Sequence, residues 1–146
     1  MNNFIFQNST KVYFGKGCVK EYLACLTKNV QTILLAYGGG SIKRNGVYDE
    51  ITGILKEAGK NIVEFSGIMS NPTYAKVQEG AKLARESGAD MILAVGGGST
   101  MDCCKAVSLA ARYGGDIWED FWAHPGVIDF DPLPLGAVSY THLTLP

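Results

Sequence analysis

A cluster of three glycines near the middle of the chain carries the clearest chemical signal. Five apolar residues, 91–95, precede the cluster and are typical of a parallel strand that is covered on both faces. After the glycines, Ser99 or Thr100 is expected to cap a helix. A helix that begins at bare glycines presents free backbone N–H groups and the positive end of its dipole, and both attract a phosphate group. The same pattern also occurs where only a tight turn is needed. The residues of this second glycine turn are Gly96, Gly97, Gly98 and Ser99.

An earlier cluster has the same form and follows the apolar segment 32–36. Two such turns in one unit are suited to a ligand with more than one phosphate, such as a dinucleotide. Neither fits the Gly-x-Gly-x-x-Gly fingerprint, because Lys43 or Met101 holds the last position, and no P-loop sequence occurs. The residues of this first glycine turn are Gly38, Gly39, Gly40 and Ser41.

The elements around the turns alternate between strand and helix patterns. Segments 4–6 and 11–14 flank Asn8-Ser9-Thr10 and predict a β-hairpin. Apolar segments predict strands over 32–36, 61–65, 91–95 and near 135–138, and helical spacing predicts helices over 19–26, 47–58 and 99–112. A further helix is expected to follow Asn71-Pro72-Thr73 and to end at Gly88, with Val77, Ala81 and Ala84 on one face. This order predicts an α/β fold: a Rossmann-like, doubly wound, mainly parallel sheet with an N-terminal hairpin. Both glycine turns and Asn71 are then expected at the carboxyl edge of the sheet.

Composition narrows the class of protein. The chain has 146 residues, 47% of them hydrophobic, which suits one domain with a buried core. The net charge of −1 gives no broad basic surface for nucleic acid or an anionic membrane. We see neither a membrane-spanning apolar run nor a signal peptide, and the four cysteines form no Cys-x-x-Cys pair. These features predict a cytoplasmic protein in which cysteines serve as small hydrophobic residues.

Four segments together resemble the iron-dependent alcohol dehydrogenases, and the butanol dehydrogenase branch in particular. They are residues 4–17, residues 37–49, Asn71-Pro72, and Gly96 to Ser99 with Asp102. The resemblance covers residues 1 to about 138. It implies a nucleotide domain that is followed, in the family, by an all-helical metal domain. Members of the family interconvert alcohols and aldehydes or ketones with NAD or NADP.

The resemblance also assigns roles to residues of the second turn and its neighbourhood. It places Gly97 and Gly98 against the pyrophosphate, with a hydroxyl from Ser99 and with Asp102 in the same motif. It places Asn71 near the adenosine. The alternative for Asn71 is a helix N-cap, with Pro72 at the first helical position.

The first turn bears on the choice of coenzyme. NAD-preferring relatives carry an acidic residue just after the strand, and the matching positions here are Gly38 and Gly39. In place of that carboxylate, the N–H of Gly40, the Ser41 hydroxyl and the Lys43 cation are expected to hold a 2′-phosphate. We therefore expect NADP rather than NAD, with NAD possible. The alternative for Lys43 is an ordinary solvated charge.

The family holds Fe²⁺ or Zn²⁺ with one Asp and three His in its helical domain, and this chain has only His124 and His142. No catalytic or metal-binding residue is therefore assigned. We expect a dinucleotide-binding domain over 1–138, an aberrant tail over 139–146, and a fragment that binds NADP weakly and catalyses nothing alone. The parent is expected to act on an alcohol or aldehyde as a homodimer. The alternatives are a glycerol dehydrogenase-like or dehydroquinate synthase-like domain, or a nucleotide-binding module without chemistry.

Overall fold

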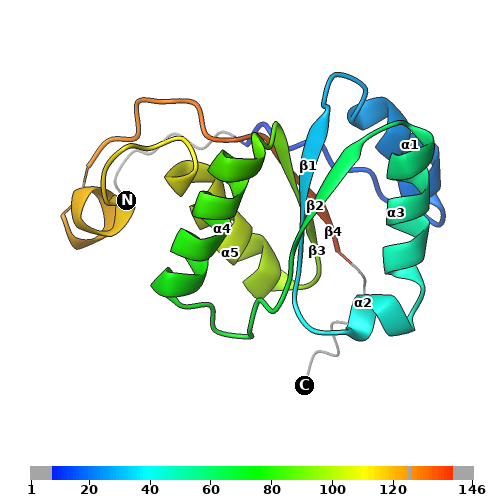
Figure 1. The fold of residues 1–146 in the computed structure, drawn as a ribbon, viewed down its shortest axis with the longest axis horizontal. Helices are drawn as coiled ribbons and strands as arrows, with labels where there is room; N and C mark the ends of the chain where they lie inside the picture. Colours follow the sequence, from blue (N-terminus) through cyan, green and yellow to red (C-terminus); the bar gives the residue numbers. More distant parts are fainter. Residues whose placement is uncertain (1–7, 125, 140–146) are drawn as a thin grey trace, which may run out of the picture.

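A four-stranded parallel sheet forms the centre of the computed structural model, which describes residues 8–124 and 126–139. The strand order is β2-β1-β3-β4, so β1 and β3 lie in the middle. Helices cover both faces, with α1 and α3 on one side and α4 and α5 on the other (Figure 1). The strands are β1 (Thr32–Tyr37), β2 (Asn61–Phe65), β3 (Met91–Val95) and β4 (Leu135–Val138). The helices are α1 (Cys18–Leu26), α2 (Ser41–Arg44), α3 (Val47–Glu57), α4 (Tyr74–Ser87), α5 (Gly98–Ala110) and the π-helical η1 (Trp118–Ala123).

The predicted α/β class, with its mainly parallel, doubly wound sheet, is confirmed. All three strand pairs are parallel, and all six residues of β1 are buried. Alternate β1 residues enter different cores: Leu34 and Ala36 face α4 and α5, whereas Ile33, Leu35 and Tyr37 face α1 and α3. A continuous apolar run is therefore the pattern that a strand covered on both faces requires.

Glycine lets α4 approach the sheet closely. A Cβ atom on Gly80 would lie 2.7 Å from the Phe65 ring and 2.8 Å from a methyl group of Val107. Gly80 thus allows α4 to pack onto β2 and α5 at once, and it fixes the α4–α5 layer against the sheet.

Only the second segment of the predicted N-terminal hairpin lies within the described residues. The first segment, 4–6, lies outside them, and residues 11–14 form no strand. Val12 and Phe14 are 78% and 93% exposed, and Tyr13 instead packs on Tyr22 of α1, with 4.7 Å between the ring centroids. Within the described part of the chain, the sheet has four strands, and residues 11–14 pair with none of them. A strand pattern without a partner strand stays irregular.

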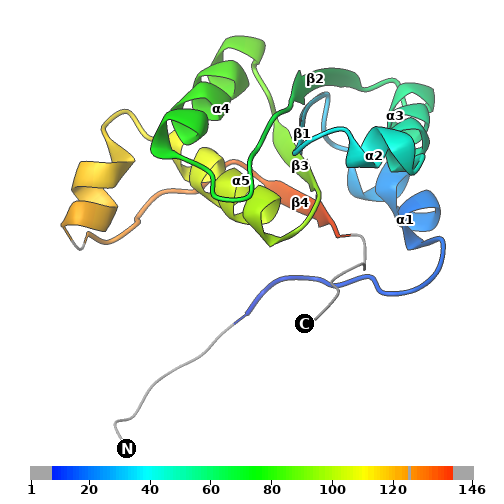
Figure 2. The ribbon, with the colours of Figure 1, turned by 90° about the horizontal axis from the view of Figure 1, so that it is seen from below.

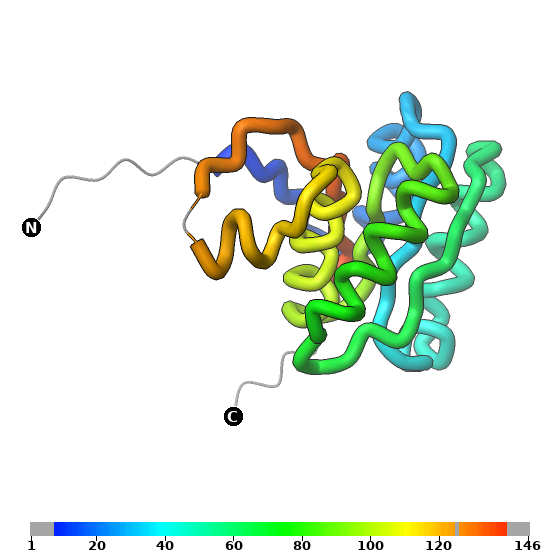
Figure 3. The backbone as a smooth tube through the Cα atoms, turned by 60° about the vertical axis from the view of Figure 1, so that its left-hand side comes forward, coloured from blue at the N-terminus to red at the C-terminus, as the bar shows by residue number. Residues whose placement is uncertain are grey.

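The predicted helix over 47–58 is shorter and has a separate turn before it. Gly46 has a φ of 79°, a left-handed conformation that separates α2 from α3. Beyond α5, the chain forms η1 and an extended segment that projects from the body of the fold (Figure 3). Trp118 and Trp122 of η1 are about half exposed and contact each other and Tyr74.

Candidate functional site

The carboxyl edge of the sheet brings the predicted site segments together, and Figure 2 views the molecule from the side of this edge. In the β1–β3 register, Tyr37 pairs with Val95, so both glycine turns leave the sheet at the same level. The hydroxyl of Ser99 donates a hydrogen bond to the carbonyl of Ser70, next to Asn71. Side by side, the two turns and the segment at Asn71 therefore form one continuous edge.

The helix that follows the second turn presents open backbone. α5 begins at Gly98, and Gly97 caps it in an extended conformation with no side-chain hydrogen bond. The expected capping by Ser99 or Thr100 is therefore wrong, because both residues already lie inside the helix. The N–H groups of the first turn have no carbonyl one turn earlier within the helix to accept from them. A Cβ atom on Gly97 or Gly98 would meet no atom within 4 Å, so a ligand has room to approach there.

Gly96 has a different role from its two neighbours. It is buried, and a Cβ atom there would lie 2.6 Å from Oγ1 of Thr100. Its N–H donates to the carbonyl of Val138 at 3.1 Å. Packing and the β3–β4 ladder thus account for this glycine, and its amide is already engaged within the fold.

The first turn leads into α2, a helix of only four residues with Gly40 at its N-cap. Gly38 is confined by the chain, because a Cβ atom there would lie 3.0 Å from the carbonyl oxygen of Ile68. Gly39 is exposed, and a Cβ atom on it would meet open space. One helical turn adds little dipole, so recognition at this turn depends on side chains more than at α5.

The side chains beside α2 form a cluster that the sequence did not reveal. Lys43 Nζ lies 3.6 Å from a carboxylate oxygen of Glu64, and 4.6 Å and 5.3 Å from the ring centroids of Tyr48 and Tyr37. Both tyrosine hydroxyls donate to that carboxylate, Tyr48 at 2.5 Å. The hydrogen bonds from Tyr37 and then Tyr48 lower the pKa of Glu64 below its usual value. Glu64 stands on the α3 side of β2, and no local pattern links it to a glycine turn.

Asn71 and Asp102 flank the second turn. α4 begins two residues later than expected: Thr73 is its N-cap and accepts from the N–H of Lys76 at 3.3 Å. The alternative of Asn71 as the cap is therefore wrong, and Asn71 is exposed. Asp102 lies on the first turns of α5 and pairs with Lys105 at 3.0 Å, which offsets its negative charge.

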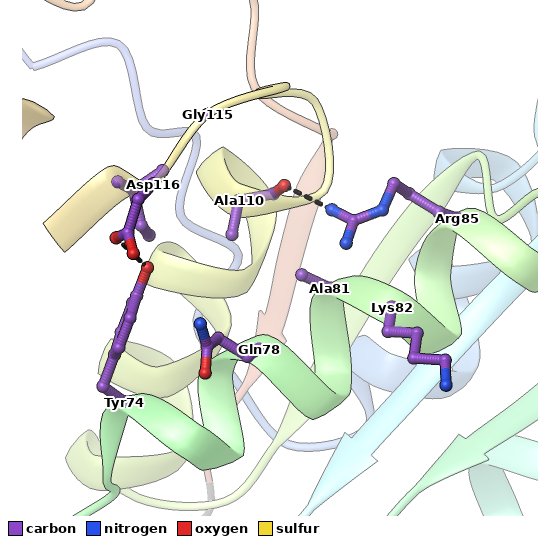
Figure 4. A pocket seen from close by; sticks show the side chains of 9 residues that line it. Tyr74, Gln78, Ala81, Lys82, Arg85, Ala110, Gly115 and Asp116 are labelled. Atoms are coloured by element: carbon purple, nitrogen blue, oxygen red, sulfur yellow. Dashed lines mark hydrogen bonds between the residues drawn. The ribbon is translucent and has the colours of Figure 1, made fainter. Parts of the chain in front are cut away.

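One hollow lies beside Asp102 and another lies between α4 and α5, and neither is lined by the glycine turns. The smaller, about 270 Å³, includes Asp102, Tyr74 and both tryptophans of η1. The larger, about 350 Å³, lies between α4 and α5 (Figure 4). At one end Tyr74 donates to Asp116 at 2.5 Å, and at the other Arg85 donates to the carbonyl of Ala110 at 2.7 Å. The glycine turns thus form an open edge, as expected for a ligand that lies across the carboxyl ends of the strands.

Residues 8–124 and 126–139 contain no group of three or more His, Cys, Asp or Glu side chains that could hold a metal ion. No helix in the same ranges is long and apolar enough to cross a membrane.

Comparison with known proteins supports the resemblance. Residues 9–144 match the family model of iron-containing alcohol dehydrogenases. The chain is 47% identical over 138 residues to the probable NADH-dependent butanol dehydrogenase 2 of Bacillus subtilis, which covers 94% of this chain and 35% of that protein. It is 37% identical over 148 residues to the NADPH-dependent aldehyde reductase YqhD of Escherichia coli, covering all of this chain and 36% of that protein.

A solved structure shows the same relationship in three dimensions. The NADH-dependent butanol dehydrogenase A of Thermotoga maritima superposes with a TM-score of 0.83 at 40% identity, over 94% of this chain and 34% of that one. This chain therefore spans about a third of the length of the relatives it matches. By sequence and by fold, it belongs to the iron-containing alcohol dehydrogenase family.

Proposed function

We propose that residues 1–138 form the dinucleotide-binding part of a metal-dependent alcohol dehydrogenase or aldehyde reductase. The whole enzyme would transfer hydride between NADP(H), or NAD(H), and an alcohol or aldehyde. The observation that carries the proposal is the position of the glycine turns. The strand order reverses direction between β1 and β3, and α3 and α5, which follow these strands, cover opposite faces of the sheet. Open α/β sheets bind their ligands at such a switch point.

The residues at the edge suit the pyrophosphate and the adenosine half of a dinucleotide. The open N–H groups at Gly98 and Ser99, with the dipole of α5, suit a pyrophosphate. Gly39, Ser41 and Asn71 stand where the adenosine half would lie across the first turn. The coenzyme supplies the hydride when bound. Fe²⁺ or Zn²⁺ as a Lewis acid would need ligands other than the described residues.

For the coenzyme, we propose NADP ahead of NAD. Residues 38–40 carry no carboxylate, and two cations, Lys43 and Arg44, stand on α2. Relatives named for NADH and for NADPH are both similar to the chain, so the family alone does not decide the choice. The homodimer of the parent, the cytoplasmic location and the separate character of residues 139–146 remain predictions; residues 140–146 lie outside the described residues.

A titration of the 146-residue chain tests the proposal. NADPH and NADH are added while the fluorescence of the nicotinamide is followed, and ATP serves as a nucleotide control. We expect saturable binding of both coenzymes, tighter for NADPH, and competition by ADP-ribose. The same chain with NADP⁺, butanol and Fe²⁺ or Zn²⁺ is expected to form no NADPH. Binding of ATP with equal affinity would favour the nucleotide-binding module without chemistry. No nucleotide binding at all would refute the proposed function.

A further inference from the structure

Two cations stand on α2, but they have different surroundings. The Lys43 ammonium is drawn towards β2, where it pairs with Glu64 at 3.6 Å. A Cβ atom on Gly40 would lie 3.2 Å from Nη1 of Arg44, so that guanidinium group lies beside the glycine turn. The carboxylate of Glu64 therefore neutralises one of the two positive charges that α2 brings to this turn.

The Glu64 carboxylate is held firmly in its position. It accepts hydrogen bonds from Tyr37 and Tyr48, and these rings also lie beneath the Lys43 ammonium. Tyr37 is 3% exposed and is the last residue of β1, directly before Gly38. Strand and turn thus fix the carboxylate relative to the glycines, and its charge acts on any anion bound at the first turn.

We propose that Glu64 limits the affinity of the first glycine turn for a 2′-phosphate and so narrows the preference between NADP and NAD. This inference rests on the proposed coenzyme binding. The carboxylate that discriminates between the two coenzymes would then lie on β2, whereas the sequence pattern pointed to positions 38 and 39. A 2′-phosphate carries between one and two negative charges, so Glu64 both repels it and engages Lys43. A coenzyme with a free 2′-hydroxyl meets neither effect.

The test uses Glu64→Gln in the 146-residue chain. Tyr37 and Tyr48 donate to different oxygens of Glu64. Gln keeps one of these acceptors, presents its NH2 group to the other hydroxyl, and removes the charge. The probes are 2′,5′-ADP and 5′-ADP, titrated by calorimetry at low salt. We expect the Kd for 2′,5′-ADP to fall about two- to fivefold, since exposed charge pairs have modest energies, and the Kd for 5′-ADP to change less than this. In Lys43→Met, we expect the Kd for 2′,5′-ADP to rise, and adding Glu64→Gln to recover part of the loss.

Glu86→Gln is the matched control. Glu86 forms a similar exposed pair with Lys82, at 3.8 Å, near the far end of α4 from the glycine turns. This control is expected to leave both Kd values unchanged. If Glu64→Gln shifts both probes equally, or shifts neither while the wild type binds both, the role of Glu64 is refuted and coenzyme binding stands. If the wild type binds neither probe nor coenzyme, the proposed function fails and this inference fails with it.

Discussion

Alanine at Gly96 and at Gly98 separates a packing role from a ligand-binding role within one turn. In Gly96→Ala, the new methyl group would lie 2.6 Å from Oγ1 and 3.0 Å from Cβ of Thr100, which is 6% exposed and β-branched. Overpacking of this kind costs about 1–3 kcal/mol. At about 2–4 °C per kcal/mol for a chain near this size, we expect the melting temperature to fall by about 2–12 °C.

In Gly98→Ala, the methyl group meets no atom of the chain within 4 Å, and the residue is the first of α5. We therefore expect the melting temperature to stay within about 2 °C, because surface substitutions usually change stability by no more than about 0.5 kcal/mol. The methyl group would occupy the space through which a pyrophosphate reaches the N–H groups. We expect the Kd for NADPH to rise at least about tenfold, equivalent to about 1.4 kcal/mol.

Thermal melts followed by circular dichroism and NADPH titrations by fluorescence are measured on the wild type and both variants. Gly96→Ala should change mainly the melting temperature, and Gly98→Ala should change mainly the Kd for NADPH. A Gly96→Ala chain with an unchanged melting temperature would refute the packing role of that glycine. A Gly98→Ala chain that binds NADPH as the wild type does would remove the α5 N-terminus from the binding site.

Three further predictions concern stability and reactivity. Gly80→Ala should destabilise the fold by about 1–3 kcal/mol, because its methyl group would overlap an aromatic ring of β2. Gly53→Ala lies within α3, where a Cβ atom meets open space, and should stabilise the fold by about 0.5–1 kcal/mol. Urea unfolding that changes in the same direction for both variants would contradict this. Burial raises the pKa of Cys104 to about 12. A thiol reagent at pH 8 should therefore label exposed Cys25 in the folded chain and Cys104 only after unfolding. Rapid labelling of Cys104 in the folded chain would show that it is not packed in the core. Backbone N–H groups where β1 begins lower the pKa of Asp90. Its contribution to the free energy of unfolding is therefore present above the unfolded pKa of about 3.9 and is lost as the pH falls through the lower folded pKa. Asp90→Asn should make stability less dependent on pH in this range, and an unchanged acid dependence would contradict this role.

The sheet could be predicted from the sequence because burial on both faces leaves a direct trace. The runs 32–36, 61–65 and 91–95 became strands with bounds that differ by one residue at most. Helix starts were harder. Asn71 and Thr73 both have side chains that can cap a helix N-terminus. The structure has Thr73 as the N-cap of α4, with an extended backbone conformation that the sequence alone does not indicate. The hairpin prediction used local pattern alone, and residues 11–14 form no strand, since a strand depends on a partner that a local pattern does not reveal.

The candidate site was predictable as a set of turns and not as a set of contacts. Glycine clusters after buried strands predicted that both turns lie at the carboxyl edge of the sheet, and the β1–β3 register brings them there. The individual roles depend on side chains that arrive from elsewhere: Thr100 folds back against Gly96, and the Ile68 carbonyl confines Gly38. The pairing of Lys43 with Glu64 joins two elements that only the parallel register brings together. Such contacts leave no periodic signal in the chain.

The two glycine turns look alike in sequence, but their different helices give them unequal roles under the proposed function. α5 has thirteen residues, so its N–H groups and dipole act on the pyrophosphate, which NAD and NADP share. α2 has four residues, so charged side chains determine recognition at the first turn, where the two coenzymes differ. Substitutions at the second turn should therefore change the affinity for both coenzymes in parallel. Those around Lys43 and Glu64 should change the ratio between them, because only the 2′-phosphate responds to the local charge.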